Sequence, residues 1–190
     1  MLTTITPYIP LLIKGTFTTL AAWVLILCMS ILIGTTLGIL SCKYLAYTRL
    51  QRCIRMYTFI AKGIPAYVQI LIAYFALPAL LGINLQAFWA CALALTFCSS
   101  GYVTEIIRGG INTVPLGQWQ ACLVLGYPLR ATLTRIILPQ TIANVLPSLI
   151  GECEQILKST ALFAAIGVCE LTRTGMNIIS RELNPIPVYF

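Results

Sequence analysis

The chain has 190 residues, of which 59% are hydrophobic and 9% charged, and its mean hydropathy is +0.92. Soluble domains carry about 25% charged residues, so this composition excludes a soluble globular protein and predicts an integral membrane protein. Twelve Lys and Arg stand against five Asp and Glu, giving a net charge of +7. The basic residues fall between apolar runs, which argues against a nucleic-acid partner and is typical of loops that orient membrane proteins.

The eight cysteines predict neither a metal site nor a bound cofactor. The chain has no His and no C-x-x-C pair, so the usual ligand spacings are missing. Most of the cysteines sit inside apolar segments, where a thiol behaves as a small hydrophobe. We therefore expect packing roles for Cys28, Cys42, Cys53, Cys91, Cys98, Cys122, Cys153 and Cys169.

The first membrane-spanning helix is predicted over Gly15–Cys42, an uncharged run of about 28 residues, long enough for a bilayer. No basic residue precedes Lys14, which argues against a cleaved secretory signal. The following basic residues have no acidic residue among them, so this loop is predicted to be cytoplasmic and the N-terminus outside. These residues are Lys43, Arg49, Arg52 and Arg55.

A second uncharged run, Gly63–Thr104, covers about 42 residues and is long enough for two spans. The turn formers between Pro78 and Asn84 predict a break there, with one span ending near Leu80 and the next starting near Leu85. This third span is expected to return to the cytoplasm at Glu105, Arg108, Gly109 and Gly110.

The stretch Pro115–Pro139 interrupts the apolar pattern. It holds a short helical segment over 117–125, then Gly126, a Tyr-Pro break and a basic amphipathic run. Two or three helical turns cannot cross a bilayer, so the segment is predicted to lie beside the membrane. Its basic residues again indicate the cytoplasmic side.

The fourth span is predicted from about Ile136 to Leu157, with Pro139 in its first turn. Its later part carries Glu152, Glu154 and Lys158. Such groups usually face a bundle interior or an aqueous cavity, although an ion pair that reaches water at the helix end explains Glu154 and Lys158 equally well.

Beyond the fourth span the chain becomes less apolar. The segment Ala161–Val168 is too short to span and fits a packed or re-entrant helix. A polar tail follows over Thr172–Phe190, and its last residues resemble the start of a further membrane segment.

The stretch Pro115–Pro139 resembles a known family motif. Gln120-Ala121-Cys122, then Gly126, then Ile136-x-Leu138-Pro139 resembles the EAA loop of ABC importer permeases, with the spacing intact. Further segments are similar to the polar amino acid uptake permeases of the histidine, glutamine and arginine type. These segments are Lys62-Gly63-Ile64-Pro65 with Gln69, 101–119, Leu146-Pro147 with Glu152, 158–162 and 166–172.

The resemblance implies an all-α membrane protein with four transmembrane helices and a cytoplasmic coupling helix, similar to a five-helix permease without its last helix. One permease domain is expected over residues 1–190, in a bacterial inner membrane. The implied partners are a separate ATP-binding cassette subunit, a second permease subunit and an extracytoplasmic amino acid binding protein. The chain itself has no G-x-x-x-x-G-K-[ST] motif, so ATP hydrolysis is assigned to the partner.

The implied coupling residues are Trp119, Gln120, Ala121, Cys122, Leu123, Gly126, Ile136, Leu138 and Pro139. Trp119 and Leu123 lie four residues apart and would form one apolar face for a partner groove. A helix lying on lipid has the same spacing. Gln120 replaces the family's Glu, which removes a charge from the loop.

The candidate substrate path comprises Lys62, Glu152, Glu154, Lys158 and Thr160, in which Lys158 would meet a carboxylate and Glu154 an ammonium group. The family's frequent Asp is Ser159 here, which favours a neutral polar substrate over a cationic one. Two alternatives are a non-transporting, truncated membrane scaffold and a permease for another small solute.

Overall fold

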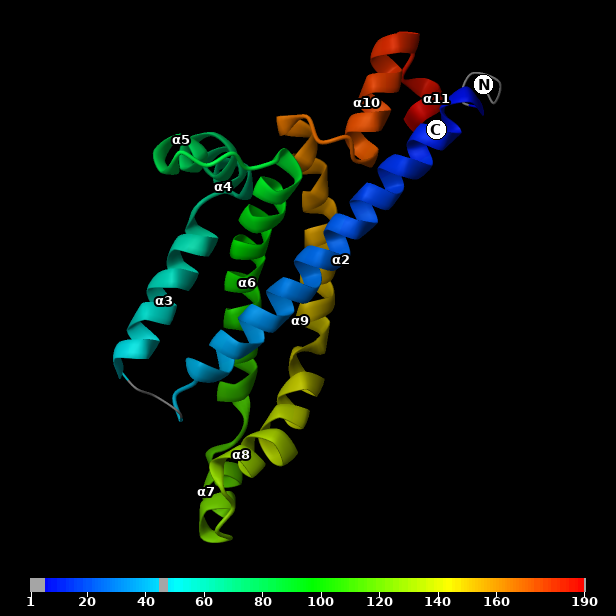
Figure 1. Ribbon diagram of the computed structural model, residues 1–190. Helices are drawn as coiled ribbons and strands as arrows, with labels where there is room; N and C mark the ends of the chain where they lie inside the picture. Colours follow the sequence, from blue (N-terminus) through cyan, green and yellow to red (C-terminus); the bar gives the residue numbers. More distant parts are fainter. Residues whose placement is uncertain (1–5, 45–47, 190) are drawn as a thin grey trace. The chain divides into compact units, whose positions relative to one another are not determined.

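The computed structural model describes residues 6–44 and 48–189, and these ranges contain helices and no strand (Figure 1). The predicted all-α fold is confirmed, while Phe190 lies outside the described residues. In chain order the elements are the 3₁₀ helix η1 (Thr6–Tyr8), α2 (Ile9–Leu40), α3 (Thr48–Gly63), α4 (Ala66–Leu71), the π-helix η2 (Ile72–Ala76), α5 (Leu77–Leu81), α6 (Ala87–Thr113), α7 (Leu116–Val124), α8 (Leu129–Ala131), the π-helix η3 (Thr132–Ile137), α9 (Leu138–Ser159), the 3₁₀ helix η4 (Thr160–Ile166), α10 (Leu171–Glu182) and α11 (Ile186–Tyr189).

Three helical segments in the described ranges are long and apolar enough to cross a membrane: Thr6–Leu40, Ala87–Thr113 and Leu129–Ile166. A fourth span results if the broken pair α3 and α4–α5 is counted as one. The four predicted spans therefore correspond to three continuous helical segments and one interrupted segment.

The second span was predicted to begin with the uncharged run at Gly63, and this start is wrong. The helix begins at Thr48, so Arg49, Arg52 and Arg55 lie on α3 and not in a loop, and α3 ends at Gly63. Pro65 explains the break, because proline has no N–H and disfavours helical backbone in the residue before it. The predicted end near Leu80 is confirmed, since α5 stops at Leu81 and Gly82 adopts φ 64°.

No helix end marks the predicted return of the third span at 105–110. Helix α6 continues through Glu105 and Arg108 to Thr113. The two charged side chains form an ion pair one helical turn apart, and the Thr58 hydroxyl donates to Glu105 at 3.1 Å. Because partners on the chain neutralise and solvate the carboxylate, the helix tolerates charge where the sequence suggests an exit.

Both π-helices end just before a proline. Segment η2 precedes Leu77-Pro78, and η3 precedes Leu138-Pro139. A proline ring displaces the carbonyl of the preceding turn and supplies no N–H. A wider π-turn accommodates this disruption without ending the helix, so Pro139 lies in the first turn of α9, as predicted.

The chain forms two compact units, the first built from three separate segments and the second from two. The first comprises Met1–Cys28, Pro65–Thr96 and Gln155–Phe190. Its core holds Ala22 and Ile26 of α2, Ile70 of α4, Ile156 of α9 and fully buried Phe163 of η4. The Phe163 ring meets Phe88 edge to face at 5.9 Å, so η4 is the packed short helix expected over 161–168.

The second unit comprises Met29–Ile64 and Phe97–Glu154, and close helix contacts organise its core. A Cβ built on Gly34 would lie 2.5 Å from Val103, and one on Gly38 would lie 2.7 Å from Ile107. The same test at Gly110 gives 2.1 Å to Cγ1 of Val145 on α9. Such small residues let helix backbones approach closely where lipid offers no hydrophobic driving force.

Candidate functional site

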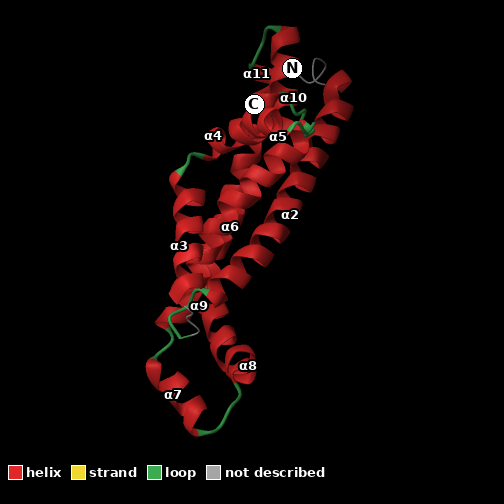
Figure 2. Cartoon of the chain, turned by 60° about the vertical axis from the view of Figure 1, so that its left-hand side comes forward, coloured by secondary structure: helices red, strands yellow, loops and turns green. Residues whose placement is uncertain are grey.

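Helix α7 is a nine-residue helix with a loop at each end (Figure 2). Its last turn closes at Gly126, whose φ of 72° is strained for other residues. The Tyr127 amide donates to the Cys122 carbonyl at 2.9 Å, and the Gly126 amide donates to the Leu123 carbonyl at 3.1 Å. Together these bonds satisfy carbonyls that the helix end would leave open. The prediction that Gly126 ends this helix in a left-handed conformation is confirmed.

The two faces of α7 have different roles. Trp119 is buried in the core of the second unit, and its ring stacks on Tyr44 with ring centroids 4.4 Å apart. Cys122 on the same helix is also buried. The prediction that Trp119 and Leu123 present one apolar face to a partner is therefore wrong for Trp119, which is 6% exposed. Its aromatic ring instead anchors α7 to the rest of the unit.

The outward face of α7 is apolar although it has no partner on the described chain. Leu123 and Val124 are 77% and 88% exposed, and Leu125 beyond the helix end is also exposed. Gln120 and Ala121 lie on the same outward side. A cavity of about 200 Å³ opens beside Gln120 and Leu123, bordered by Tyr127 and Leu129. A row of exposed aliphatic side chains on a rigid helix is suited to contact with another protein.

The remaining residues of the predicted coupling motif lie in the segment that leads from α7 into α9. Ile136 and Leu138 are partly buried against the core of the second unit, and Ile137 between them is fully buried. Pro139 follows in the first turn of α9. These residues therefore pack the segment after α7 against the core of the second unit. The exposed face available to another protein is that of α7.

A second group of polar side chains lies along α6 in the second unit. Ser99 donates to the Glu152 carboxylate at 2.6 Å. The Lys62 ammonium lies 5.3 Å from the centre of the Tyr102 ring, close enough for a cation–π interaction. Since Ser99 and Tyr102 are three residues apart on one helix, the structure brings predicted residues Lys62 and Glu152 to neighbouring positions on α6.

Three residues after Tyr102, Glu105 forms the centre of a charged cluster. Its carboxylate pairs with Arg108 and accepts from Thr58 of α3. A cavity of about 460 Å³ lies in front of this cluster and is also lined by Arg55 and Lys62. Its volume falls within the range of small-molecule sites, about 300–1,000 Å³. Three cations and one carboxylate give the cavity an excess of positive charge.

The other predicted path residues behave differently. Glu154 and Lys158 are exposed and share one face of α9, because they are four residues apart. Thr160 is buried, and its hydroxyl donates to the Leu157 carbonyl at 2.7 Å. This bond gives Thr160 a clear role in packing at the start of η4.

Sequence reasoning did not select Thr58, Ser99, Tyr102, Glu105 or Arg108 as site residues. The available signal was the spacing of Ser99, Tyr102 and Glu105, which places polar groups at intervals of three along a helix. That signal was lost because the third span was expected to end at Glu105.

Another unpredicted feature is the carboxylate of Glu170 in the first unit. It is 1% exposed and accepts from the Thr172 and Arg173 amides at 2.9 and 2.7 Å, and from the Thr19 hydroxyl at 3.3 Å. An acidic N-cap with these bonds fixes the start of α10. Its contacts are those of a structural group.

Comparison with known proteins places these features in a family. Residues 30–188 match the family described as "Binding-protein-dependent transport system inner membrane component". The arginine transport system permease protein ArtQ of Bacillus subtilis is 36% identical over 169 residues, 88% of this chain and 75% of that protein. The glutamine transport system permease protein GlnP of Escherichia coli is 32% identical over 184 residues, 96% of this chain and 83% of that protein.

Solved structures give the same result. A crystal structure of an amino acid ABC transporter with histidines superposes with a TM-score of 0.85 and 32% identity, covering 97% of this chain and 85% of that one. An inward-facing MetNI methionine ABC transporter superposes with a TM-score of 0.82 over 96% of this chain and 88% of that one. At 18% identity, the second likeness concerns the fold alone.

Proposed function

This chain belongs to the inner membrane components of binding-protein-dependent transport systems, and we propose that it moves polar amino acids through an importer driven by a separate ATPase. The substrate class is supported by relatives named for arginine and glutamine transport. Ser159, at a position where related permeases often carry Asp, favours a neutral polar amino acid such as glutamine over a cationic one.

The coupling role of α7 rests on its outward face. Leu123 and Val124 are exposed on a helix whose opposite face is anchored by Trp119, and Leu125 just after the helix is exposed as well. A force applied to the outward face would pass to the rest of the second unit through the Trp119 contacts and through the connection to α9. We propose that a groove on the ATP-binding subunit receives this face, with Gln120 making a neutral contact in place of a charged one.

The substrate path is proposed to follow the polar groups of α6. Lys62 and Glu152 supply opposite charges near Tyr102 and Ser99. A zwitterionic amino acid offers a carboxylate to the cation and an ammonium to the carboxylate, so this pair suits its backbone groups. Glu154 and Lys158 remain candidates for a similar contact on the exposed face of α9.

The proposed orientation follows from charge. The basic residues of α3 and of the segment around α7 favour the cytoplasmic side, which places the N-terminus outside. The membrane assignment would then put α7 within reach of a cytoplasmic ATPase. A second permease subunit and an extracytoplasmic binding protein complete the proposed assembly.

Copurification and uptake test the coupling proposal. Gly126→Asp forces an L-residue into a left-handed conformation at the end of α7, so we expect uptake in reconstituted vesicles to fall at least tenfold while the ATPase still hydrolyses ATP. Gly117→Asp is the control, because a side chain there meets open space.

The outcome separates the alternatives. A chain that captures no ATPase and supports no uptake is a membrane scaffold. A chain that couples normally and transports another solute in preference to glutamine and arginine keeps the mechanism and loses the proposed substrate.

A further inference from the structure

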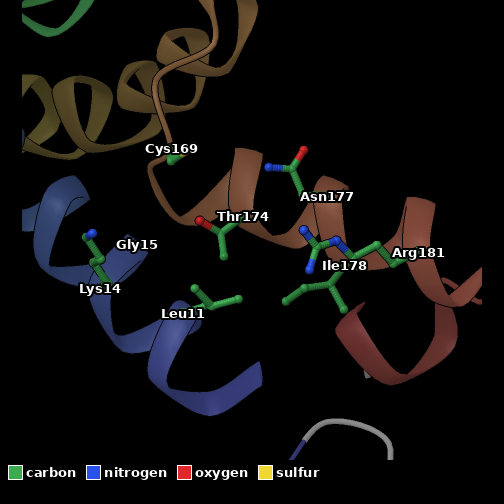
Figure 3. A pocket seen from close by; sticks show the side chains of 8 residues that line it. All are labelled: Leu11, Lys14, Gly15, Cys169, Thr174, Asn177, Ile178 and Arg181. Atoms are coloured by element: carbon green, nitrogen blue, oxygen red, sulfur yellow. The ribbon is translucent and has the colours of Figure 1, made fainter. Parts of the chain in front are cut away.

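A cavity of about 240 Å³ lies in the first unit, between the early turns of α2 and one face of α10 (Figure 3). It belongs neither to α7 nor to the polar groups of α6. The residues that matter to its chemistry are Leu11, Lys14, Thr174, Asn177, Ile178 and Arg181. They combine an apolar floor with two cations, a hydroxyl and an amide.

The walls of this cavity are held together at one end. A Cβ built on Gly15 would lie 2.9 Å from the Thr174 hydroxyl oxygen and 3.1 Å from the Leu171 Cα, so glycine permits the close approach of α10. The Thr19 hydroxyl accepts from the Leu171 amide at 3.1 Å and donates to Glu170. The cavity is therefore part of the fold and does not depend on one mobile side chain.

The charge of the cavity is positive. Lys14 of α2 and Arg181 of α10 both line it, and no carboxylate does. In Figure 3 the Arg181 side chain reaches back along α10 toward Thr174. The nearest acids on α10 have other partners, since Glu170 caps the helix and Glu182 accepts from the Tyr8 hydroxyl. An anion in the cavity would meet two cations and no carboxylate in the lining.

The sequence of α2 indicates how deep in the membrane the cavity lies. Lys14 is the last charged residue before the uncharged run 15–42, so it lies where the hydrocarbon region begins. Ile13 and Phe17 beside it are 64% and 74% exposed, as expected for side chains in contact with lipid. Helix α10 is amphipathic, with Met176 exposed on it and Leu183 exposed just after its end, which is typical of a helix in the membrane interface. These features favour a position of the cavity near the lipid headgroups.

We propose that this cavity binds the phosphate of an anionic membrane phospholipid, of the phosphatidylglycerol class. Lys14 and Arg181 neutralise the phosphodiester, as basic pockets between helices do for lipid headgroups. Thr174 and Asn177 offer hydrogen bonds to the headgroup hydroxyls, and Leu11 and Ile178 lie against the first carbons of the acyl chains. A choline headgroup carries its own cation and would meet two more.

Lipid binding to the purified full chain tests the proposal. Native mass spectrometry with added phosphatidylglycerol is expected to show saturable binding that phosphatidylcholine does not reproduce. Lys14→Gln combined with Arg181→Gln should weaken this binding about 30-fold, at the usual contribution of each basic group near a lipid surface. Arg173→Gln is the matched control, because this arginine lies on α10 and does not line the cavity.

A charge-preserving variant separates binding from folding. Lys14→Arg combined with Arg181→Lys should retain binding within about threefold, since both cations remain. Equal binding of phosphatidylcholine, displacement by millimolar inorganic phosphate, or an equal loss in Arg173→Gln would each overturn the proposal. These measurements need no ATPase or amino acid, so they stand whether or not the transport proposal holds.

Discussion

Helix α6 has two faces that differ in their contacts: one is tightly packed and apolar, and the other is polar. On one face, Val103 and Ile107 pack directly over Gly34 and Gly38 with no room for another carbon. On another, Tyr102 and Glu105 hold Lys62, Thr58 and Arg108 beside an open cavity. The packed face consists of contacts that the fold needs. The polar face places charges where a membrane helix would otherwise avoid them.

We propose that this difference separates stability from transport within one helix. Polar groups at membrane depth are costly unless they are paired or face a cavity, and they usually mark a functional path. Substitutions on the packed face should therefore remove folded protein, whereas those on the polar face should leave the protein folded and change its activity.

The largest effect is expected at the packed face. Gly110→Leu places a side chain where even a Cβ would lie 2.1 Å from Val145, and overpacking of a tight core costs about 1–3 kcal/mol, and more where the contact is severe. We expect most of the folded protein to be lost, as measured by size-exclusion chromatography and thermal melting in detergent. Gly109→Leu is the control, since nothing lies within 4 Å of its Cβ. Equal melting of the two variants would contradict the packing argument.

A smaller effect is expected from Glu105→Gln on the polar face. The change removes a charged partner of Arg108 and weakens the bond from Thr58, a loss of roughly 1.5–3 kcal/mol for a charged hydrogen bond. Uptake into proteoliposomes should fall about tenfold or more with little change in the amount of folded protein.

The double variant Glu105→Gln with Arg108→Gln sharpens this prediction. It removes both charges, so an unpaired Arg108 no longer contributes to the defect. Partial recovery of uptake is expected if pairing matters. A double variant that is worse by the product of the two single losses would show that the charges act independently.

The smallest effect is expected at Tyr102. Tyr102→Leu removes the aromatic face from Lys62, and a cation–π interaction contributes about 0.5–1 kcal/mol. Uptake should fall two- to fivefold, as roughly expected from that energy. Tyr102→Phe keeps the ring and should behave like the native chain. A defect in Tyr102→Phe equal to that in Tyr102→Leu would assign the role to the hydroxyl.

Much of the architecture could be predicted from residue patterns. The uncharged run before Cys42 predicted the first membrane helix, Gly126 predicted the end of α7, and the short apolar segment 161–168 predicted a packed helix. These features depend on local chemistry, because hydropathy, helix length and the left-handed preference of glycine act within a few turns.

Two features required the tertiary structure. Charge alone suggested that the third span ends at Glu105, but Thr58 and Arg108 give this carboxylate partners and the helix continues. Spacing alone placed Trp119 and Leu123 on one outward face, but Tyr44 covers the indole ring. Neither contact follows from local sequence, since Thr58 and Tyr44 lie 47 and 75 positions away from their partners.

The sequence by itself determined the class of the protein and the motif that surrounds α7, because composition and spacing are properties of the chain. The tertiary structure decided which side chains of that motif face outward and which polar groups meet along α6. The physical reason is that burial and charge compensation depend on neighbours distant in the chain. The same holds for the basic cavity of the first unit, which Lys14 and Arg181 both line because Gly15 lets α10 pack against α2.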